Sequence, residues 1–353
     1  MNPPVRWHLR TAVALLAAFV VFDALADAKL EVVTFNSRAL EGNPLHDPAK
    51  RSVAVFIPAQ ATNGARLPMV YYLPGFGNSS ERFISSPAAW QKFTQTLADE
   101  VAPMLLVVVD GRNRWGGSQY LNSPAQGRYE DYICDEIVAQ VEAKHPAPTQ
   151  GMRRIIAGHS SGGFGALRLA MARTNLFDAV VALSPDSAFN ISHLPPAKEP
   201  GIAGMKLAEI ERLAGPGDAA PKDGELNYHL ALSAAYAPRL GSTNGAFEWL
   251  YDADGKFRDE VWQRWLANDP LTLVEKNPHA FARRVAVYLE GAAQDQFYAN
   301  LGARKIFEVV NANLSRCVFY EPPGKHSDRV PERLQRGLAW VFNSPLNDIK
   351  PKE

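Results

Sequence analysis

The pentapeptide at 158–162, GHSSG, contains the residue of this chain best placed to act as a nucleophile. It follows the apolar run 154–157 and leads into the small-residue segment 163–167, so its context predicts a strand, a sharp turn and a helix. Glycine two residues before and two residues after a serine lets such a strained turn pack closely while the hydroxyl stays exposed. This spacing selects Ser160, because Ser161 has a histidine instead of a glycine two residues before it.

A serine hydroxyl is a weak nucleophile at neutral pH and needs a neighbouring base that a third group orients. His326 lies in a glycine-containing loop after the last apolar run and is the only histidine downstream of the candidate acid. That acid, Asp295, stands in the polar turn 290–297 before a helical pattern, where it would serve equally well as a helix N-cap. We expect Asp295 to orient His326; three other acids remain conceivable, namely Asp186, Glu290 and Asp269.

An ester or amide carbonyl attacked by Ser160 would develop a negative charge that backbone N–H groups can hold. The first donor is expected to be the N–H of Ser161, the residue after the nucleophile. The second is expected in the loop 73–78, LPGFGN, where glycines let the backbone turn toward a substrate. We predict that Phe76 supplies it.

The elements that must position these residues follow an α/β pattern, because short apolar runs alternate with helical segments. This predicts a doubly wound, mostly parallel sheet of about eight strands, several of them covered on both faces. We expect strands at 30–35, 52–57, 69–73, 105–109, 154–157, 179–183, 285–289 and 317–320. We expect helices at 88–100, 129–143, 163–172, 298–312 and 331–342.

The connection between the sixth and seventh strands, at about 98 residues, is far longer than an ordinary crossover. We expect its residues 190–283 to form a cap over the carboxyl edge of the sheet, where open α/β folds bind ligands. Trp262 and Trp265 are candidates to shape an acyl or sugar pocket there. The alternative is that they pack the cap onto the sheet, as buried aromatic side chains usually do, leaving specificity to loops around Trp115 and Tyr120.

Composition narrows the classes of partner. The chain has 37 Lys and Arg residues against 37 Asp and Glu residues, and it has no long run of like charge, so no nucleic-acid partner is expected. The remaining histidines are dispersed without metal-ligand spacing, so we predict no metal and no cofactor. The oligomeric state is left open.

The first 26 residues have the parts of a secretory signal: basic residues, an apolar run at 12–22 and an A-x-A site before Asp27. The run is about 11 residues, against the roughly 20 that a membrane span needs. We therefore expect export to the periplasm or the exterior without a stable membrane span. The two cysteines, Cys134 and Cys317, could pair in such a compartment, but a doubly wound sheet should place them far apart and we expect no disulfide.

With these residues in view, the chain resembles the putative-esterase family of the α/β hydrolases, which includes S-formylglutathione hydrolase, feruloyl and acetylxylan esterases, enterochelin-type esterases and mycolyltransferases. The likeness runs from about residue 30 to 342, and is carried by the segments at 71–77, 120–124, 127–132, 158–166, 184–186, 265–270 and 324–327. It implies an α/β-hydrolase domain over 27–353, a triad of Ser160, Asp295 and His326, and Phe76 as an oxyanion donor. Two positions depart from the family pattern: Pro74 replaces a polar residue, and the spacing from Gly291 to Asp295 is slightly long.

These observations predict an exported serine carboxylesterase that acts on a small-molecule or carbohydrate ester through an acyl-enzyme intermediate. One alternative is an acyltransferase in which a sugar or other hydroxyl replaces water. Another is a binding protein that kept the fold and lost turnover. The sequence identifies neither the acyl group nor the alcohol of the substrate.

Overall fold

The computed structural model describes residues 28–62, 64–214, 223–239, 241, 246–281, 286–314 and 316–343. Its centre is an eight-stranded sheet with the order β1-β2-β4-β3-β7-β8-β9-β10. The strands of this sheet are β1 Lys29–Asn36, β2 Lys50–Ile57, β3 Met69–Leu73, β4 Leu105–Val108, β7 Arg154–His159, β8 Ala179–Leu183, β9 Ala286–Glu290 and β10 Cys317–Tyr320. A small hairpin pairs β5 Asn122–Ser123 with β6 Gly127–Arg128. The doubly wound α/β prediction is confirmed, and each predicted strand of the sheet is found with small shifts at its ends.

In this sheet β2 runs opposite to the other seven strands. The pairs β1–β2 and β2–β4 are antiparallel, whereas every pair from β4 to β10 is parallel. The carboxyl ends of β3, β7, β8, β9 and β10 therefore meet at one edge, so the loops that follow them can build a common site.

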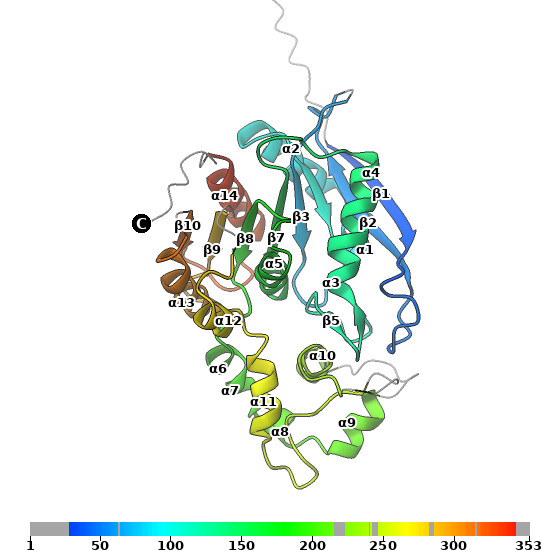
Figure 1. The fold of residues 1–353 in the computed structure, drawn as a ribbon, viewed down its shortest axis with the longest axis vertical. Coiled ribbons are helices and arrows are strands. Elements are labelled where there is room, and N and C mark those ends of the chain that lie inside the picture. Colours follow the sequence, from blue (N-terminus) through cyan, green and yellow to red (C-terminus); the bar gives the residue numbers. More distant parts are fainter. Residues whose placement is uncertain are drawn as a thin grey trace, which may run out of the picture.

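Helices cover both faces of the sheet (Figure 1). They are α1 Ser80–Ser85, α2 Ala88–Glu100, α3 Tyr129–Asp131, the π-helical η1 Tyr132–Ile137, α4 Val138–Lys144, α5 Ser161–Ala172, α12 Pro270–Lys276, α13 Ala299–Asn311 and α14 Val330–Asn343. Successive residues of β3 belong to different cores: Tyr71 is in the cluster that includes residues of η1, α5 and α13, and Tyr72 is in the cluster that includes residues of α2 and α14. The single helix expected at 129–143 is instead divided by the π-helical segment, which an apolar pattern does not distinguish from an α-helix.

A third hydrophobic cluster joins the connection between β8 and β9 to residues from earlier in the chain, among them Trp115 and Phe164. It is built on α6 Phe189–Ser192, α7 Leu194–Ala197, α8 Pro200–Ala203, α9 Leu207–Ala214, α10 Gly224–Tyr236 and α11 Asp259–Leu266. Figure 1 shows α8 to α11 together at one end of the sheet, and we call α6 to α11 the cap. By contrast α12, from the same connection, returns to the sheet, where Leu271 and Val274 join the core beside α13.

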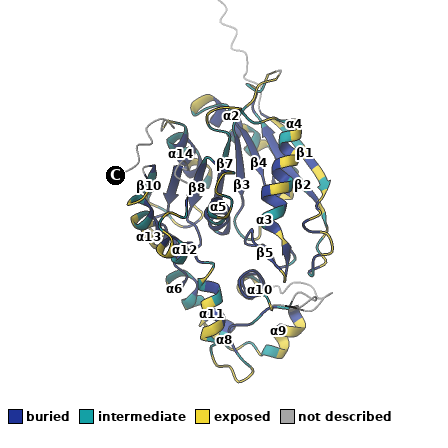
Figure 2. Cartoon of the chain, in the orientation of Figure 1, coloured by how far each residue is buried: buried dark blue, intermediate teal, exposed yellow. Residues whose placement is uncertain are grey.

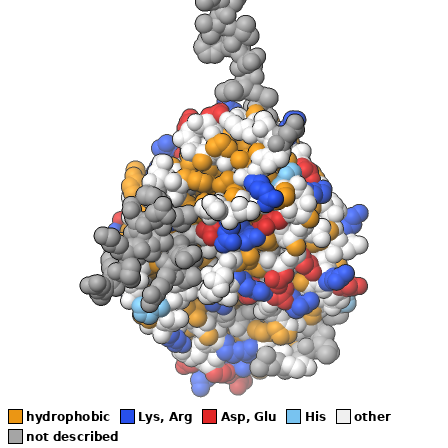
Figure 3. All heavy atoms as spheres, turned by 45° about the horizontal axis from the view of Figure 1, so that its top comes forward, with side chains coloured by type: hydrophobic (Ala, Val, Ile, Leu, Met, Phe, Trp, Pro, Cys, Tyr) orange, Lys and Arg blue, Asp and Glu red, His pale blue; other side chains and the backbone are white. Residues whose placement is uncertain are grey.

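The buried strands and the inner faces of the helices stand out in Figure 2 as a continuous interior. No disulfide joins Cys134 and Cys317, which lie in η1 and in the edge strand β10. On the face drawn in Figure 3, basic and acidic side chains are interspersed and an apolar area lies between them. None of the helices in the described ranges is both long and apolar enough to span a bilayer. The predicted signal at 1–26 lies outside the described residues.

Candidate active site

Ser160 occupies a strained turn between β7 and α5. Its φ of 58° and ψ of −124° lie in a region that L-residues rarely adopt, at a cost of about 1–3 kcal/mol. Both flanking glycines are required by close backbone contacts. A Cβ on Gly158 would lie 2.2 Å from the Gly162 carbonyl oxygen, and one on Gly162 would lie 1.8 Å from the carbonyl oxygen of Leu73. The turn therefore holds the Ser160 hydroxyl away from the backbone at the carboxyl edge of the sheet.

His326 and Asp295 form a buried hydrogen-bonded pair. Asp295 Oδ2 lies 2.7 Å from His326 Nδ1, so Nδ1–H donates and the neutral ring keeps its lone pair on Nε2. Burial by itself raises the pKa of Asp295, but the hydrogen bond and charge of His326, with the Phe297 N–H at 2.9 Å, hold it below its ordinary value. Asp295 is thus an ionised acceptor that fixes the tautomer of a potential base.

Two of the three other conceivable acids, Glu290 and Asp269, have different partners. Glu290 is buried between Arg333 and Arg336, at 2.7 Å and 3.2 Å, beneath the site. Asp269 caps α12 and also accepts the N–H groups of Ala188 and Phe189, at 2.9 Å and 3.1 Å. Neither carboxylate bonds to His326, so the geometry favours Asp295 as the orienting acid.

The loop that carries His326 is fixed through its own backbone. The His326 carbonyl oxygen accepts from His159 Nε2 at 2.9 Å and from Arg333 Nη1 at 2.8 Å, and its N–H donates to Gln296 Oε1 at 3.2 Å. Burial, with the neighbouring His326, lowers the pKa of His159 to about 3, so this histidine is a neutral donor near pH 7. His159 thus positions the candidate base.

The loop after β3 runs beside the nucleophile. A Cβ built on Gly75 would lie 3.5 Å from Ser160 Cβ, which places the Phe76 backbone next to the turn. Among the hydrogen bonds of the described residues, neither the Phe76 N–H nor the Ser161 N–H has an acceptor. The Tyr120 hydroxyl donates to the Pro74 carbonyl oxygen and ties this loop to the protein interior.

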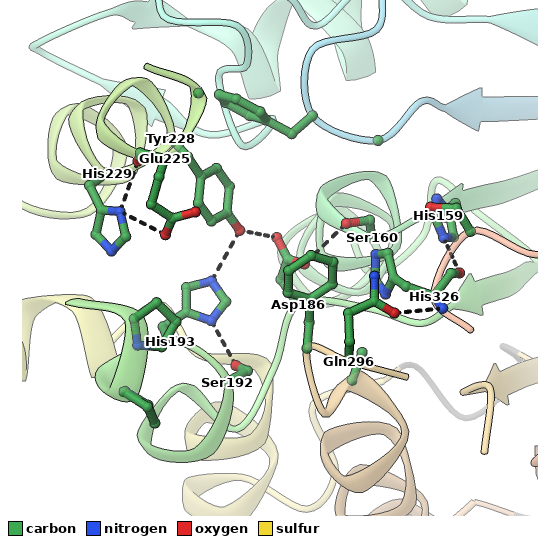
Figure 4. A pocket seen from close by; sticks show the side chains of 18 of the residues that line it. His159, Ser160, Asp186, Ser192, His193, Glu225, Tyr228, His229, Gln296 and His326 are labelled. Carbon is green, nitrogen blue, oxygen red and sulfur yellow. Dashed lines mark hydrogen bonds and ion pairs between the residues drawn. The ribbon is translucent and has the colours of Figure 1, made fainter. Parts of the chain in front are cut away.

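A pocket of about 680 Å³ contains the Ser160 and His326 side chains in its wall. Figure 4 shows both at one end of it, with Asp186 in the middle and the cap residues Tyr228 and His193 opposite. Among the described residues, the one hydrogen bond of the Ser160 hydroxyl is to Asp186 Oδ1, at 3.4 Å. At that length the hydrogen bond is weak.

The four aromatic residues expected to bind substrate do not line this pocket. Trp262 and Trp265 are packed against each other in the cap cluster, with ring centroids 5.7 Å apart. Trp115 is fully buried in the same cluster, and Tyr120 supports the loop after β3. All four rings are enclosed by protein, which for Trp262 and Trp265 is the arrangement expected if they pack the cap.

A model of the family described as putative esterase matches residues 48–331, most of the chain. The chain belongs to the putative-esterase family. That range contains the strained serine turn, the Asp295–His326 pair and the whole cap.

Individual relatives agree with the family assignment. The S-formylglutathione hydrolase of Mus musculus is 27% identical over 161 residues, which cover 42% of this chain and 56% of that protein. The S-formylglutathione hydrolase structure from Staphylococcus aureus superposes with a TM-score of 0.57 at 16% identity, covering 90% of this chain and all of the other. The CE1 ferulic acid esterase from Anaeromyces mucronatus gives 0.52 at 14% identity, with 92% and 93% covered. These two structures establish a shared fold.

Sequence reasoning missed the polar residues that the cap contributes to the pocket. Tyr228, near the start of α10, donates to Asp186 Oδ2 at 2.8 Å and lies 3.3 Å from His193 Nε2. The one usable signal was the N-cap Asp223, whose side chain accepts from the N–H groups of Glu225 and Leu226. This signal would have located the helix, but not the face of it that contacts Asp186.

Proposed function

We propose that this protein is a serine carboxylesterase whose triad is Ser160, Asp295 and His326. The observation that supports this best is the 2.7 Å hydrogen bond between Asp295 and His326, because His326 lines the same pocket as the strained Ser160. An acid, a base with a fixed tautomer and an exposed hydroxyl are the groups that acyl transfer needs. Membership of the putative-esterase family supports the same reaction class.

In the proposed reaction, Ser160 Oγ attacks the ester carbonyl carbon and its proton passes to His326 Nε2. The N–H groups of Phe76 and Ser161 stabilise the oxyanion; a single donor of this kind is worth about 10²–10³ in rate. Collapse of the intermediate breaks the bond to the alcohol, which leaves with the proton from His326. Water then attacks the carbonyl carbon of the acyl-enzyme while His326 takes its proton. The second intermediate collapses, releases the carboxylic acid and returns the proton to Ser160 Oγ.

Asp295 keeps the imidazole in the tautomer that has its lone pair on Nε2 and stabilises the cation that forms. The strained turn contributes by holding the hydroxyl at the pocket before the substrate arrives. The chemistry uses side chains and backbone alone.

We also propose export, with a mature chain that begins at or near Asp27. Amino-terminal sequencing of protein recovered from the periplasm or the medium tests this directly. An intact Met1 on active cytoplasmic protein would contradict it.

The esterase proposal is tested by turnover of ethyl and phenyl esters of graded acyl length, with feruloyl and acetylated sugars beside them. Ser160→Ala should abolish activity on every ester that the wild type hydrolyses, whereas Ser233→Ala, which removes a buried cap hydroxyl, should retain it. Adding sugar alcohols as acceptors separates hydrolysis from acyl transfer by the product formed. Absence of turnover across the whole panel would favour the silent binding protein.

A further inference from the structure

The pocket wall carries negative charge without a compensating basic side chain. Three carboxylates line it, from Asp186, Glu199 and Glu225, and no Lys or Arg is among the described lining residues. Burial lowers the pKa of His193 to about 4 and also lowers the pKa of His229, so these lining histidines are neutral near pH 7. A cavity of this kind attracts cations and repels anions.

Asp186 is the carboxylate nearest the reacting atoms. Its residue is only 7% exposed, and no Lys or Arg in the described part of the chain forms an ion pair with it. Oδ2 accepts two hydrogen bonds, from Ser161 Oγ and the Tyr228 hydroxyl, both at 2.8 Å. Within the described ranges, Oδ1 has only the weak contact with Ser160 Oγ at 3.4 Å, so one buried carboxylate oxygen keeps acceptor capacity beside the nucleophile.

A buried carboxylate without a cation is costly, and a bound cation would offset that cost. We propose that the substrate is an ester with an ammonium group one or two carbon atoms from the ester linkage, and that Asp186 selects it. This inference rests on the proposed esterase function and names the substrate class of the same site.

The distances allow this arrangement. A carbonyl carbon poised for attack lies about 3–3.5 Å from Ser160 Oγ. An ammonium nitrogen one carbon away lies roughly 2.5 Å from that carbonyl carbon. Because Asp186 Oδ1 is itself 3.4 Å from Ser160 Oγ, the nitrogen can approach it at hydrogen-bond distance while the carbonyl stays in place.

Aromatic rings add to the attraction. Phe76 and Tyr228 both line the pocket and meet edge to face, with ring centroids 4.8 Å apart, and Phe297 lines it beside His326. An organic cation held between a carboxylate and such rings gains electrostatically from both. Anionic acyl groups are disfavoured by the same wall.

The test compares esters of equal shape that differ in charge. On the acyl side, L-alanine ethyl ester is paired with ethyl isobutyrate, at about pH 6.5 so that the α-amino group is protonated. On the alcohol side, choline isobutyrate is paired with 3,3-dimethylbutyl isobutyrate. The wild type should favour the charged member of at least one pair by about tenfold or more in kcat/KM, and the pair concerned tells on which side of the ester the ammonium lies.

Asp186→Asn keeps the size of the side chain and an acceptor for Ser161 and Tyr228 but removes the charge. This variant should lower the charged-to-neutral ratio by about tenfold, mainly by slowing the charged ester. Asp135→Asn, the same change on the distant segment η1, should leave the ratio as in the wild type.

The outcomes separate the two proposals. Turnover of the neutral esters without preference for either charged one overturns the inference and leaves the esterase function standing. If Asp186→Asn lowers kcat/KM by the same factor on the charged and the neutral ester of a pair, the inference is also overturned, because an equal loss indicates a structural role for Asp186. If the wild type hydrolyses no ester at all, the proposed function itself fails. The wild-type ratio alone decides the matter if the variant does not fold.

Discussion

At the scale of single residues, the site depends on side chains that hold its backbone in place as much as on the triad. Tyr120 is the clearest case. Its hydroxyl donates to the Pro74 carbonyl oxygen, one residue before Gly75 and two before the candidate donor Phe76. The ring fits against Gly111 and Gly165, where a Cβ would lie 2.3 Å and 2.4 Å from it. Tyr120 is therefore a positioning residue for the oxyanion loop.

Tyr120→Phe should lower kcat by about tenfold with little change in KM, because the loop that presents the Phe76 N–H loses a buried hydrogen bond. Steady-state kinetics on a neutral ester measure this split. Tyr236→Phe is the matched control, since among the described residues the buried Tyr236 hydroxyl has no hydrogen-bond partner. Equal behaviour of the two variants would contradict a positioning role.

The residues that sequence reasoning found and those it missed differ in a physical way. Ser160, Asp295 and His326 each follow a strand of the sheet, so the alternation of strands and helices predicted that they would converge. Asp186 also follows a strand, yet its contact with Tyr228 exists only after the cap has folded over it. No local pattern encodes that contact.

At the scale of elements, the cap is where prediction from the sequence was weakest. The sheet strands are short apolar runs with turn residues on both sides, and these are recognisable without tertiary context. Helix α10 is buried over most of its surface, from Leu226 to Tyr236, so it lacks the one-sided apolar stripe that identifies a helix. The sequence identified the tryptophans of α11 as candidates, but it did not predict that they are buried against the rest of the cap.

Trp262→Ala and Trp265→Ala should reduce kcat/KM by a similar factor on short-chain, long-chain and aromatic acyl esters. Each change removes a ring enclosed by the cap cluster and should cost about 3–5 kcal/mol of stability. Kinetics on the three esters, together with thermal melts, give both quantities. A reordered substrate preference at an unchanged melting temperature would instead assign the rings to substrate binding.

At the scale of the whole molecule, buried neutral histidines make folding depend on pH. The pKa of His193 is lowered to about 4, mainly by burial and partly by His229, with Asp186 acting in the opposite direction. In the unfolded chain the same group titrates near 6.5. Between pH 6.5 and about pH 4 the unfolded chain binds a proton at this histidine that the folded protein does not bind. The free energy of unfolding therefore decreases as the pH is lowered through this range.

His193→Gln should therefore weaken the pH dependence of stability. Between pH 7 and pH 5 the wild type should lose about 2 kcal/mol more than the variant, as measured by urea unfolding at each pH. His279 is exposed, so His279→Gln should lose as much stability between pH 7 and pH 5 as the wild type does. Parallel curves for the wild type and His193→Gln would show that His193 titrates normally in the folded protein.

The central claim, that Ser160 and His326 act as one catalytic unit, is tested most directly by a double-mutant cycle in kcat/KM on an activated neutral ester. Ser160→Ala and His326→Ala should each lower the rate by about 10⁴-fold or more, and the double variant should be scarcely slower than either. His279→Ala serves as the control for loss of an imidazole. Losses that multiply in the double variant, or a single variant with near-wild-type activity, would contradict the account.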